Sequence, residues 1–276
     1  ALLNAYVVLQ EKENDYLNDM WCYVDDKWNQ EKYANKDEAS VPQRRAFHSA
    51  SVYNNDFIVI FGGQTFKKKP LNDVCVFNIN TKSWDICDNI ENAPCARYDH
   101  SGVVVQNTLI IYGGRTEDRI FNDCYLFDLD NKTWQQLKIE NCKLTPRYGH
   151  QGIAWNDIVI FIGGTPDNRQ GSPTTAINPA TRHGKSFSSF GNVPPSLTMF
   201  GIALYNDTII IYGGCEAGTK TARGEVYMVH IPSNIKVQIE EKTALPPQPR
   251  NRLNTFTSSN ARFNVYKRDN SGIFHI

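Results

Sequence analysis

Pairs of adjacent glycines recur along this chain at an almost constant spacing, and this regularity limits the possible folds more than any other feature. The pairs begin at residues 62, 113, 163 and 213, so the successive offsets are 51, 50 and 50 residues. Each pair follows an apolar run such as Ile58-Val59-Ile60-Phe61. A fixed period of about 50 residues predicts an array or a propeller built from one repeated supersecondary unit.

Other residues repeat in register with the glycines. The best preserved copy has an Arg and a His three residues apart, an apolar strand ending in Gly-Gly, an Asn-Asp pair and a Trp: Arg97, His100, Gly113-Gly114, Asn122-Asp123 and Trp134. This combination resembles the kelch repeat, and the resemblance covers almost the whole chain. The WD repeat has a shorter period of about 40 to 45 residues and a Trp-Asp pair in every blade. Here Trp-Asp occurs once, at Trp84-Asp85.

The resemblance implies an all-β, kelch-type β-propeller that occupies residues 1–276 as a single domain, and the count of six sequence copies predicts a six-bladed one. Each blade has four strands, A to D: A follows the Arg and His, B ends in Gly-Gly, C follows Asn-Asp, and D carries the Trp. The first copy starts at its strand B, near Tyr6, and a sixth copy starts at Arg252 and uses Phe263 to Tyr266 as strand B. Five blades plus an appendage is the alternative. We expect the domain to be part of a longer chain.

Local chemistry supports this reading. Glycine tolerates positive φ, so the Gly-Gly pair is expected where strand B bends out of the sheet. No Gly-Lys-Ser/Thr sequence follows it, which argues against a phosphate-binding loop. Tight A-B hairpin turns are predicted at Asn54-Asn55, Gln106-Asn107, Asn156-Asp157 and Asn206-Asp207.

Two copies depart from the pattern. In the fourth, Pro173 and Pro179 predict a short or irregular strand C, because proline cannot donate to a central ladder, and Phe187 is expected in the place of the Trp. In the fifth, Val237 and Ile239 are expected in that place. The three tryptophans of the first copies are predicted to pack between blades: Trp28, Trp84 and Trp134.

Composition excludes several classes of partner. The 29 basic residues balance the 29 acidic ones, so no global field favours nucleic acid or a membrane surface. No apolar run is long enough to span a membrane. Seven cysteines without a Cys-x-x-Cys pair predict reduced thiols and a cytoplasmic location, with the nucleus as the alternative. The sequons at Asn131 and Asn206 keep a secreted protein as a weaker alternative.

The long loops between strands B and C, and those joining D to the next A, should lie on one face, where function on such scaffolds concentrates. In kelch domains that capture acidic peptides, arginines at the mouth of strand A bind the peptide, so the resemblance implies that role for the arginines here. The alternative is that each Arg satisfies loop carbonyls or pairs with an Asp or Glu of the adjacent blade. The predicted partner-binding residues are Arg45, Arg97, Arg147, Arg252, Tyr98, Tyr148, Lys67, Lys68 and Lys69.

These expectations describe a non-enzymatic scaffold that binds a protein, or an acidic or phosphorylated peptide, without a metal or cofactor. The alternative is a propeller enzyme or a metal-dependent specifier protein that uses His48, His100 and His150 near the central channel. The iron-binding specifier proteins place Asp and His four residues apart, and no His here has an Asp at that spacing. The Cys-Tyr copper site of galactose oxidase cannot be matched either.

Overall fold

The computed structural model describes residues 5–8, 15–35, 37–167, 169, 171–191, 194–219, 221–240, 263–268 and 274–275. The chain divides into two compact units, and each is considered by itself below. Unit 1 comprises residues 1–136 with 146–148, and unit 2 comprises residues 137–145 with 149–276. A single domain over residues 1–276 stays a prediction.

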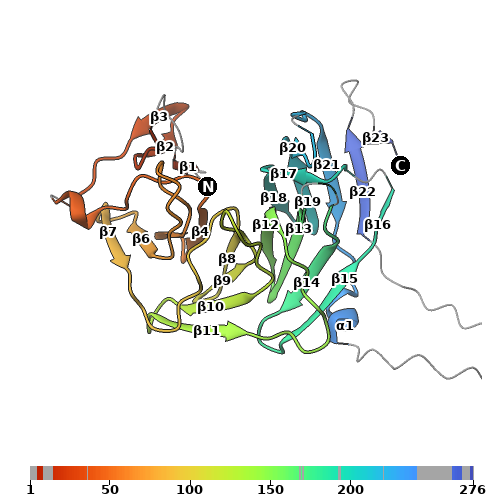
Figure 1. Cartoon of the computed structure of the whole chain (residues 1–276). Coiled ribbons are helices and arrows are strands. Elements are labelled where there is room, and N and C mark those ends of the chain that lie inside the picture. Colours follow the sequence, from red (N-terminus) through yellow and green to blue (C-terminus); the bar gives the residue numbers. More distant parts are fainter. Residues whose placement is uncertain are drawn as a thin grey trace, which may run out of the picture. The chain divides into compact units, whose positions relative to one another are not determined.

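Unit 1 is built from three antiparallel sheets, each made of strands that follow one another in the sequence (Figure 1). The first contains β1 (Ala5–Val8), β2 (Met20–Val24) and β3 (Lys27–Gln30). After the short 3-10 helix η1 (Glu38–Ser40), the second contains β4 (Ser49–Tyr53), β5 (Phe57–Phe61), β6 (Val74–Asn78) and β7 (Ser83–Cys87). The third contains β8 (Ser101–Val105), β9 (Thr108–Tyr112), β10 (Cys124–Asp128) and β11 (Thr133–Leu137).

These strands are the predicted A to D strands of the first three copies. The first sheet begins at strand B as expected, since β1 pairs with β2 and the described residues supply no strand A to it. The A-B turns are as tight as predicted: Asn54 and Asn55 both have positive φ, of 50° and 58°, between β4 and β5. Paired positive φ values are typical of the hairpin turns whose twist matches that of the strands.

The paired glycines bend the chain as predicted. Gly62 and Gly63 have φ values of +62° and +93° directly after β5. A Cβ on Gly63 would lie 2.7 Å from the carbonyl oxygen of Ala46, closer than real side chains approach. The position therefore requires glycine for both its dihedral angle and its close approach to the start of strand A.

Aromatic residues fill the space between neighbouring sheets of unit 1. Trp134 on β11 lies 4.8 Å from Phe127 of its own sheet and 5.3 Å from Phe61 of the preceding sheet, between ring centroids. Trp84 and Trp134 are each only 7% exposed, which confirms their predicted packing. The prediction is wrong for Trp28, which stacks on Tyr23 at 5.1 Å but remains 52% exposed.

Unit 2 contains a fourth sheet as regular as the second and third. It consists of β12 (Tyr148–Trp155), β13 (Ile158–Thr165), β14 (Thr174–Asn178) and β15 (His183–Phe187), whose first residue, Tyr148, belongs to unit 1. The predicted irregular strand C is therefore wrong. Pro173 and Pro179 lie directly before and after β14, so neither interrupts a ladder hydrogen bond inside it. All five residues of β14 are buried.

The prediction that Phe187 takes the place of the Trp in this sheet is also wrong. Gly184, not Phe187, pairs with Ile177 as Trp84 pairs with Phe77 in the second sheet. A Cβ on Gly184 would lie 3.1 Å from the side chain of Ile139, which fills the space. Phe187 pairs with Thr174 and is buried in the same sheet.

The fifth sheet departs most from the repeat. It runs in the order β16 (Ser189–Gly191), β22 (Phe263–Arg268), β21 (Val226–His230), β19 (Thr208–Tyr212) and β18 (Gly201–Tyr205), with β23 (Phe274–His275) paired to β22. Beside it lies the pair β17 (Leu197–Thr198) and β20 (Cys215–Glu216). The expected strand D with Val237 and Ile239 is instead helix α1 (Ile235–Glu240), whose Ile235 and Ile239 are fully buried.

The segment predicted to open a sixth sheet completes the fifth one. β22 pairs antiparallel with β21 and occupies the position of its missing strand D. The predicted strand A of the sixth copy, with Arg252, lies outside the described residues. The architecture is thus an all-β, kelch-type propeller in which the described residues form five sheets of three or more strands and the two-stranded pair of β17 and β20, and six blades stay a prediction.

Candidate functional site

Two of the repeated arginines hold their own sheet together. Arg97 donates from Nη1 and Nη2 to the two carboxylate oxygens of Asp123, at 2.6 and 3.2 Å, and from Nη1 to the carbonyl oxygen of Gly113 at 2.9 Å. Arg45 repeats this arrangement on Asp73, at 2.8 and 2.7 Å, and donates at 3.0 Å to the equivalent glycine carbonyl. Each guanidinium therefore joins three segments: the start of strand A, the Gly-Gly bend and the start of strand C.

These arginines are in the interior. Arg45 is 1% exposed, and Arg97 and Arg147 are fully buried. Burial alone would raise the pKa of Asp73, but the hydrogen bonds and charge of Arg45 hold it below its ordinary value. A planar guanidinium matched to a carboxylate in this way is an internal cross-link. This burial is incompatible with direct contact between these three side chains and a partner in this conformation.

The alternative, in which the arginines bind loop carbonyls or pair with acidic residues, describes Arg45 and Arg97. The expected location of the acidic partner is wrong, because each aspartate lies in the arginine's own sheet and not in the adjacent blade. The sequence contained the signal, because Asp73 and Asp123 directly precede strand C in the copies of Arg45 and Arg97. The copy of Arg147 has Pro173 at that position.

Of the histidines that follow the arginines, His48 and His100 are neutral, and His100 and His150 pack against aromatic rings. His100 shares a hydrogen bond of 2.9 Å with the hydroxyl of Ser49 in the preceding sheet of unit 1, and its ring lies 5.1 Å from that of Phe61. Burial lowers the pKa of His100 to about 3, and burial with the nearby Arg45 lowers that of His48 to about 4. In unit 2, His150 packs against Phe161, with 5.9 Å between the ring centroids. Within the described residues no three His, Cys, Asp or Glu side chains gather in a way that could hold a metal.

An arginine that the repeat did not single out occupies the loop face of unit 1. Arg115 follows the second Gly-Gly bend, Gly113-Gly114, and its Nε donates to Asp99 at 2.9 Å. Its guanidinium carbon lies 4.2 Å from the ring centroid of Tyr148 and 5.2 Å from that of Tyr98. The Arg115 side chain is 32% exposed. The bond to Asp99 and the two cation-π contacts hold this partly exposed guanidinium in position.

The two tyrosines have a supporting role in this arrangement. Tyr98 and Tyr148 are only 7% and 9% exposed, so little of either ring could touch a partner. Their faces instead orient Arg115. Sequence reasoning selected both tyrosines but missed Arg115, because Arg115 lies in a loop where the copies differ, with Gln64 and Thr165 at the equivalent positions.

Aromatic rings continue from this arginine across the loop face. Tyr98 lies 6.2 Å from Phe47, Phe47 lies 6.4 Å from Tyr16, and Tyr16 lies 5.7 Å from Phe66, all between ring centroids. Phe66, at the far end, is 51% exposed. The name aromatic row is used below for this set: Phe66, Tyr16, Phe47, Tyr98, Arg115 and Tyr148.

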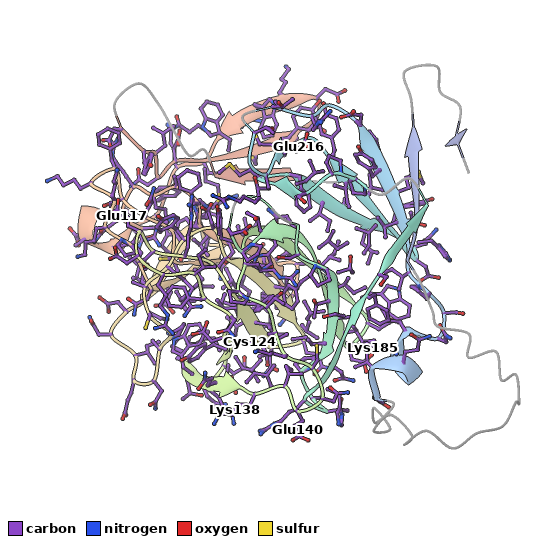
Figure 2. All side chains as sticks on the ribbon, turned by 45° about the vertical axis from the view of Figure 1, so that its right-hand side comes forward. Glu117, Cys124, Lys138, Glu140, Lys185 and Glu216 are labelled. Atoms are coloured by element: carbon purple, nitrogen blue, oxygen red, sulfur yellow. The ribbon has the colours of Figure 1, made fainter. Side chains whose placement is uncertain are left out.

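The three consecutive lysines extend from the loop that carries Phe66, between β5 and β6. Backbone hydrogen bonds close this loop: the amide of Lys68 donates to the carbonyl of Thr65 at 2.8 Å, and the amide of Thr65 donates to that of Lys69 at 2.9 Å. Lys68 lies 3.6 Å from Glu117, with 74% and 61% of the side chains exposed, so this ion pair contributes little. Glu117 lies at the outside of unit 1 in Figure 2. Lys67 and Lys69 are exposed, and no carboxylate of the described residues pairs with either.

The remaining predictions concern the cysteines, membrane spans and Arg252. All seven cysteines are described, and all are free thiols; Cys124, labelled in Figure 2, is enclosed by neighbouring side chains and 1% exposed. Among the described residues no helix combines the length and apolar character that crossing a membrane requires. Arg252 lies outside these residues, so its predicted binding role has no structural counterpart here.

Comparison with known proteins supports the kelch-type fold. The Rab9 effector protein with kelch motifs of Homo sapiens is 32% identical over 82 residues, which are 29% of this chain and 22% of that protein. Acyl-CoA-binding domain-containing protein 4 of Arabidopsis thaliana is 37% identical over 65 residues, 23% of this chain and 10% of that protein. Kelch repeat-containing protein 2 of Saccharomyces cerevisiae is 31% identical over 93 residues, 30% of this chain and 10% of that protein.

The matched segments thus span from 10% to 22% of these relatives' own lengths. A model of the KLHDC2/KLHL20/DRC7 Kelch-repeats domain matches residues 7–214, which are three quarters of the chain and include all four Gly-Gly pairs. The chain belongs to the KLHDC2/KLHL20/DRC7 Kelch-repeats domain family.

Proposed function

We propose that this protein is a non-enzymatic interaction module that binds a segment of a partner protein on the loop face of unit 1. The observation that carries the proposal is Arg115. Its Nε is bonded to Asp99, whereas its two Nη groups have no hydrogen-bond partner within the described part of the chain. A guanidinium that is fixed in position and open on its outer side is suited to a carboxylate or a phosphate, because charge-assisted bonds to such groups are short and directional.

The surroundings of Arg115 support binding of a polypeptide. Aromatic residues and arginine are enriched in the buried centres of protein interfaces. The aromatic row brings both together on one face, and Lys67 to Lys69 add positive charge at its far end. Acidic and phosphorylated segments offer the matching charge, so we propose them as the partner class.

Family membership supports the same class of function. The Rab9 effector protein with kelch motifs is named for an effector role toward Rab9, which is a statement about that protein alone. For this chain we propose partner binding without a named partner. Catalysis is not proposed, because His48 and His100 of the enzymatic alternative are neutral and His150 packs against Phe161.

The number of blades is a separate proposal. Six blades follow from the count of sequence copies, and this closure requires Phe263 to Tyr266 to form a sheet of their own. The pairing of β22 with β21 supports the alternative of five blades plus an appendage. Neither closure changes the loop face of unit 1, on which the proposed function depends.

Site-specific photo-crosslinking tests the binding face. A photoreactive phenylalanine analogue replaces exposed Phe66 in one sample and exposed Gln106 in another, because Gln106 lies in an A-B turn at the opposite ends of the strands. After irradiation in cells, we expect a discrete protein adduct from position 66 and none from position 106. Adducts at position 106 alone, or at neither position, would rule out the proposed face.

A further inference from the structure

A groove at one end of the aromatic row has the form of a second contact for the partner. It has a volume of about 960 Å³ and lies between the connection that precedes β4 and the loop between β5 and β6, entirely within unit 1. Pockets that bind ligands commonly measure about 300 to 1,000 Å³. The groove is therefore large enough for a side chain together with the adjoining backbone of a peptide.

The floor of the groove is apolar and rigid. Val41 and Ile86 line it and pack against the core cluster formed by the first two sheets. Leu71, also in the lining, is 8% exposed. Apolar side chains supported by a packed core do not need to rearrange to receive an apolar group, which reduces the cost of binding.

The rim of the groove is positively charged on one side. Lys67 and Lys69 line it, together with half-exposed Phe66. Two of the lining carboxylates are already neutralised: Asp15 by Arg44 at 3.2 Å, and Asp73 by Arg45 at 2.7 Å. Asp88 is the remaining acidic lining residue, so the two lysines leave a net positive charge beside the apolar floor.

The loop that carries the lysines is preorganised. The Thr65 carbonyl and hydroxyl accept hydrogen bonds from the amides of Lys68 and Lys69, at 2.8 and 3.3 Å. Residue Lys68 has a φ of 60°, which turns the chain at the tip of the loop. Lys67 and Lys69 thereby lie in the groove lining, whereas Lys68 between them does not.

We infer that this groove binds an acidic peptide segment with one large apolar side chain, which lies on the floor while neighbouring carboxylates contact Lys67 and Lys69. The inference rests on the proposed interaction function and specifies the sequence that the partner must present. A small apolar molecule would leave the two lysines unused. A uniformly acidic segment would leave the apolar floor exposed to water.

Selection from a random library of twelve-residue peptides on the full chain tests this inference. We expect the enriched peptides to share a Leu, Ile, Met or Phe flanked by Asp or Glu. The double substitution Lys67→Glu with Lys69→Glu should weaken their affinity at least tenfold in fluorescence polarisation. Ala39→Trp, which adds bulk at an exposed lining position, should weaken it similarly.

Two controls separate this inference from the proposed function. Lys68→Glu changes the charge of the same loop outside the groove and should alter the affinity less than threefold. Arg115→Lys tests the aromatic row. If the enriched peptides respond to Arg115→Lys but to neither groove variant, the face is correct and the groove is not the site. Enriched peptides without acidic residues, or no enrichment at all, would overturn the inference, and the crosslinking result would then decide whether the function stands.

Discussion

Removing one buried arginine gives a sharp test of the internal cross-links. In Arg97→Met, a side chain of similar length without charge replaces a fully buried guanidinium. The carboxylate of Asp123, 18% exposed at its side chain, loses two charge-assisted bonds, and the carbonyl oxygens of Gly113 and Cys95 each lose a donor. Breaking a buried pair by removing one partner costs about 3 to 5 kcal/mol. We expect a loss of about 3 kcal/mol, because water reaches part of Asp123.

Urea denaturation followed by tryptophan fluorescence measures this loss. The double variant Arg97→Met with Asp123→Leu removes the unpaired carboxylate, so it should lose at least 1 kcal/mol less than the sum of the two single losses, since side chains in contact couple. A loss below about 1 kcal/mol in Arg97→Met, or strictly additive losses, would refute the reasoning.

Three further outcomes follow from local geometry. Gly63→Ala should lower the free energy of unfolding by about 2 to 3 kcal/mol, because the new side chain combines a positive φ with a clash. In Gly224→Ala the added Cβ has no heavy atom within 4 Å, so the free energy of unfolding should change by less than about 0.5 kcal/mol. Stability should fall below pH 6.5, because the unfolded chain binds protons to His48 and His100 while the folded pKa values of about 4 and about 3 keep both neutral. At pH 5 this difference in proton binding lowers the stability by about 2 kcal/mol per histidine. A pH series of urea midpoints should therefore show a smaller loss of stability at low pH for His100→Gln than for the wild type. An unchanged pH slope would contradict the assignment of His100 as a neutral residue. Phe66→Ser should leave the free energy of unfolding within about 0.5 kcal/mol of the wild type, since Phe66 is half-exposed. A larger loss would show that the contact of Phe66 with Tyr16 is structural.

The repeated parts of the fold were predictable because their physical causes are local. Glycines at positive φ and polar turns mark the strand ends in the four copies that have the Gly-Gly pair, so the hairpins of the second and third sheets appear where the sequence placed them. The errors arose where a local rule depended on the exact boundary of an element. Pro173 and Pro179 flank β14 rather than interrupt it, and a shift of three residues separates Phe187 from Gly184 at the Trp position.

Contacts between distant segments were harder to predict. β22 joins β21 across more than thirty residues of sequence, and no periodic pattern indicates that choice over a sheet of its own. Arg115 lies in a variable loop, and its role depends on rings from two other segments, Tyr98 and Tyr148. The pairing of Arg97 with Asp123 was recognisable in principle, because the two residues recur together as Arg45 and Asp73 in the preceding copy.

The central claim is that buried arginines stabilise the sheets whereas Arg115 binds the partner, and one affinity ratio tests it most directly. The substitution Arg115→Lys keeps a positive charge for Asp99 but removes the planar fork, which lysine does not reproduce. The measurement is the dissociation constant of the segment crosslinked at position 66, determined by calorimetry for the wild type and for Arg115→Lys. The account predicts binding about tenfold weaker, or about 1.4 kcal/mol, at an unchanged urea midpoint. Equal affinities for the two proteins would contradict it.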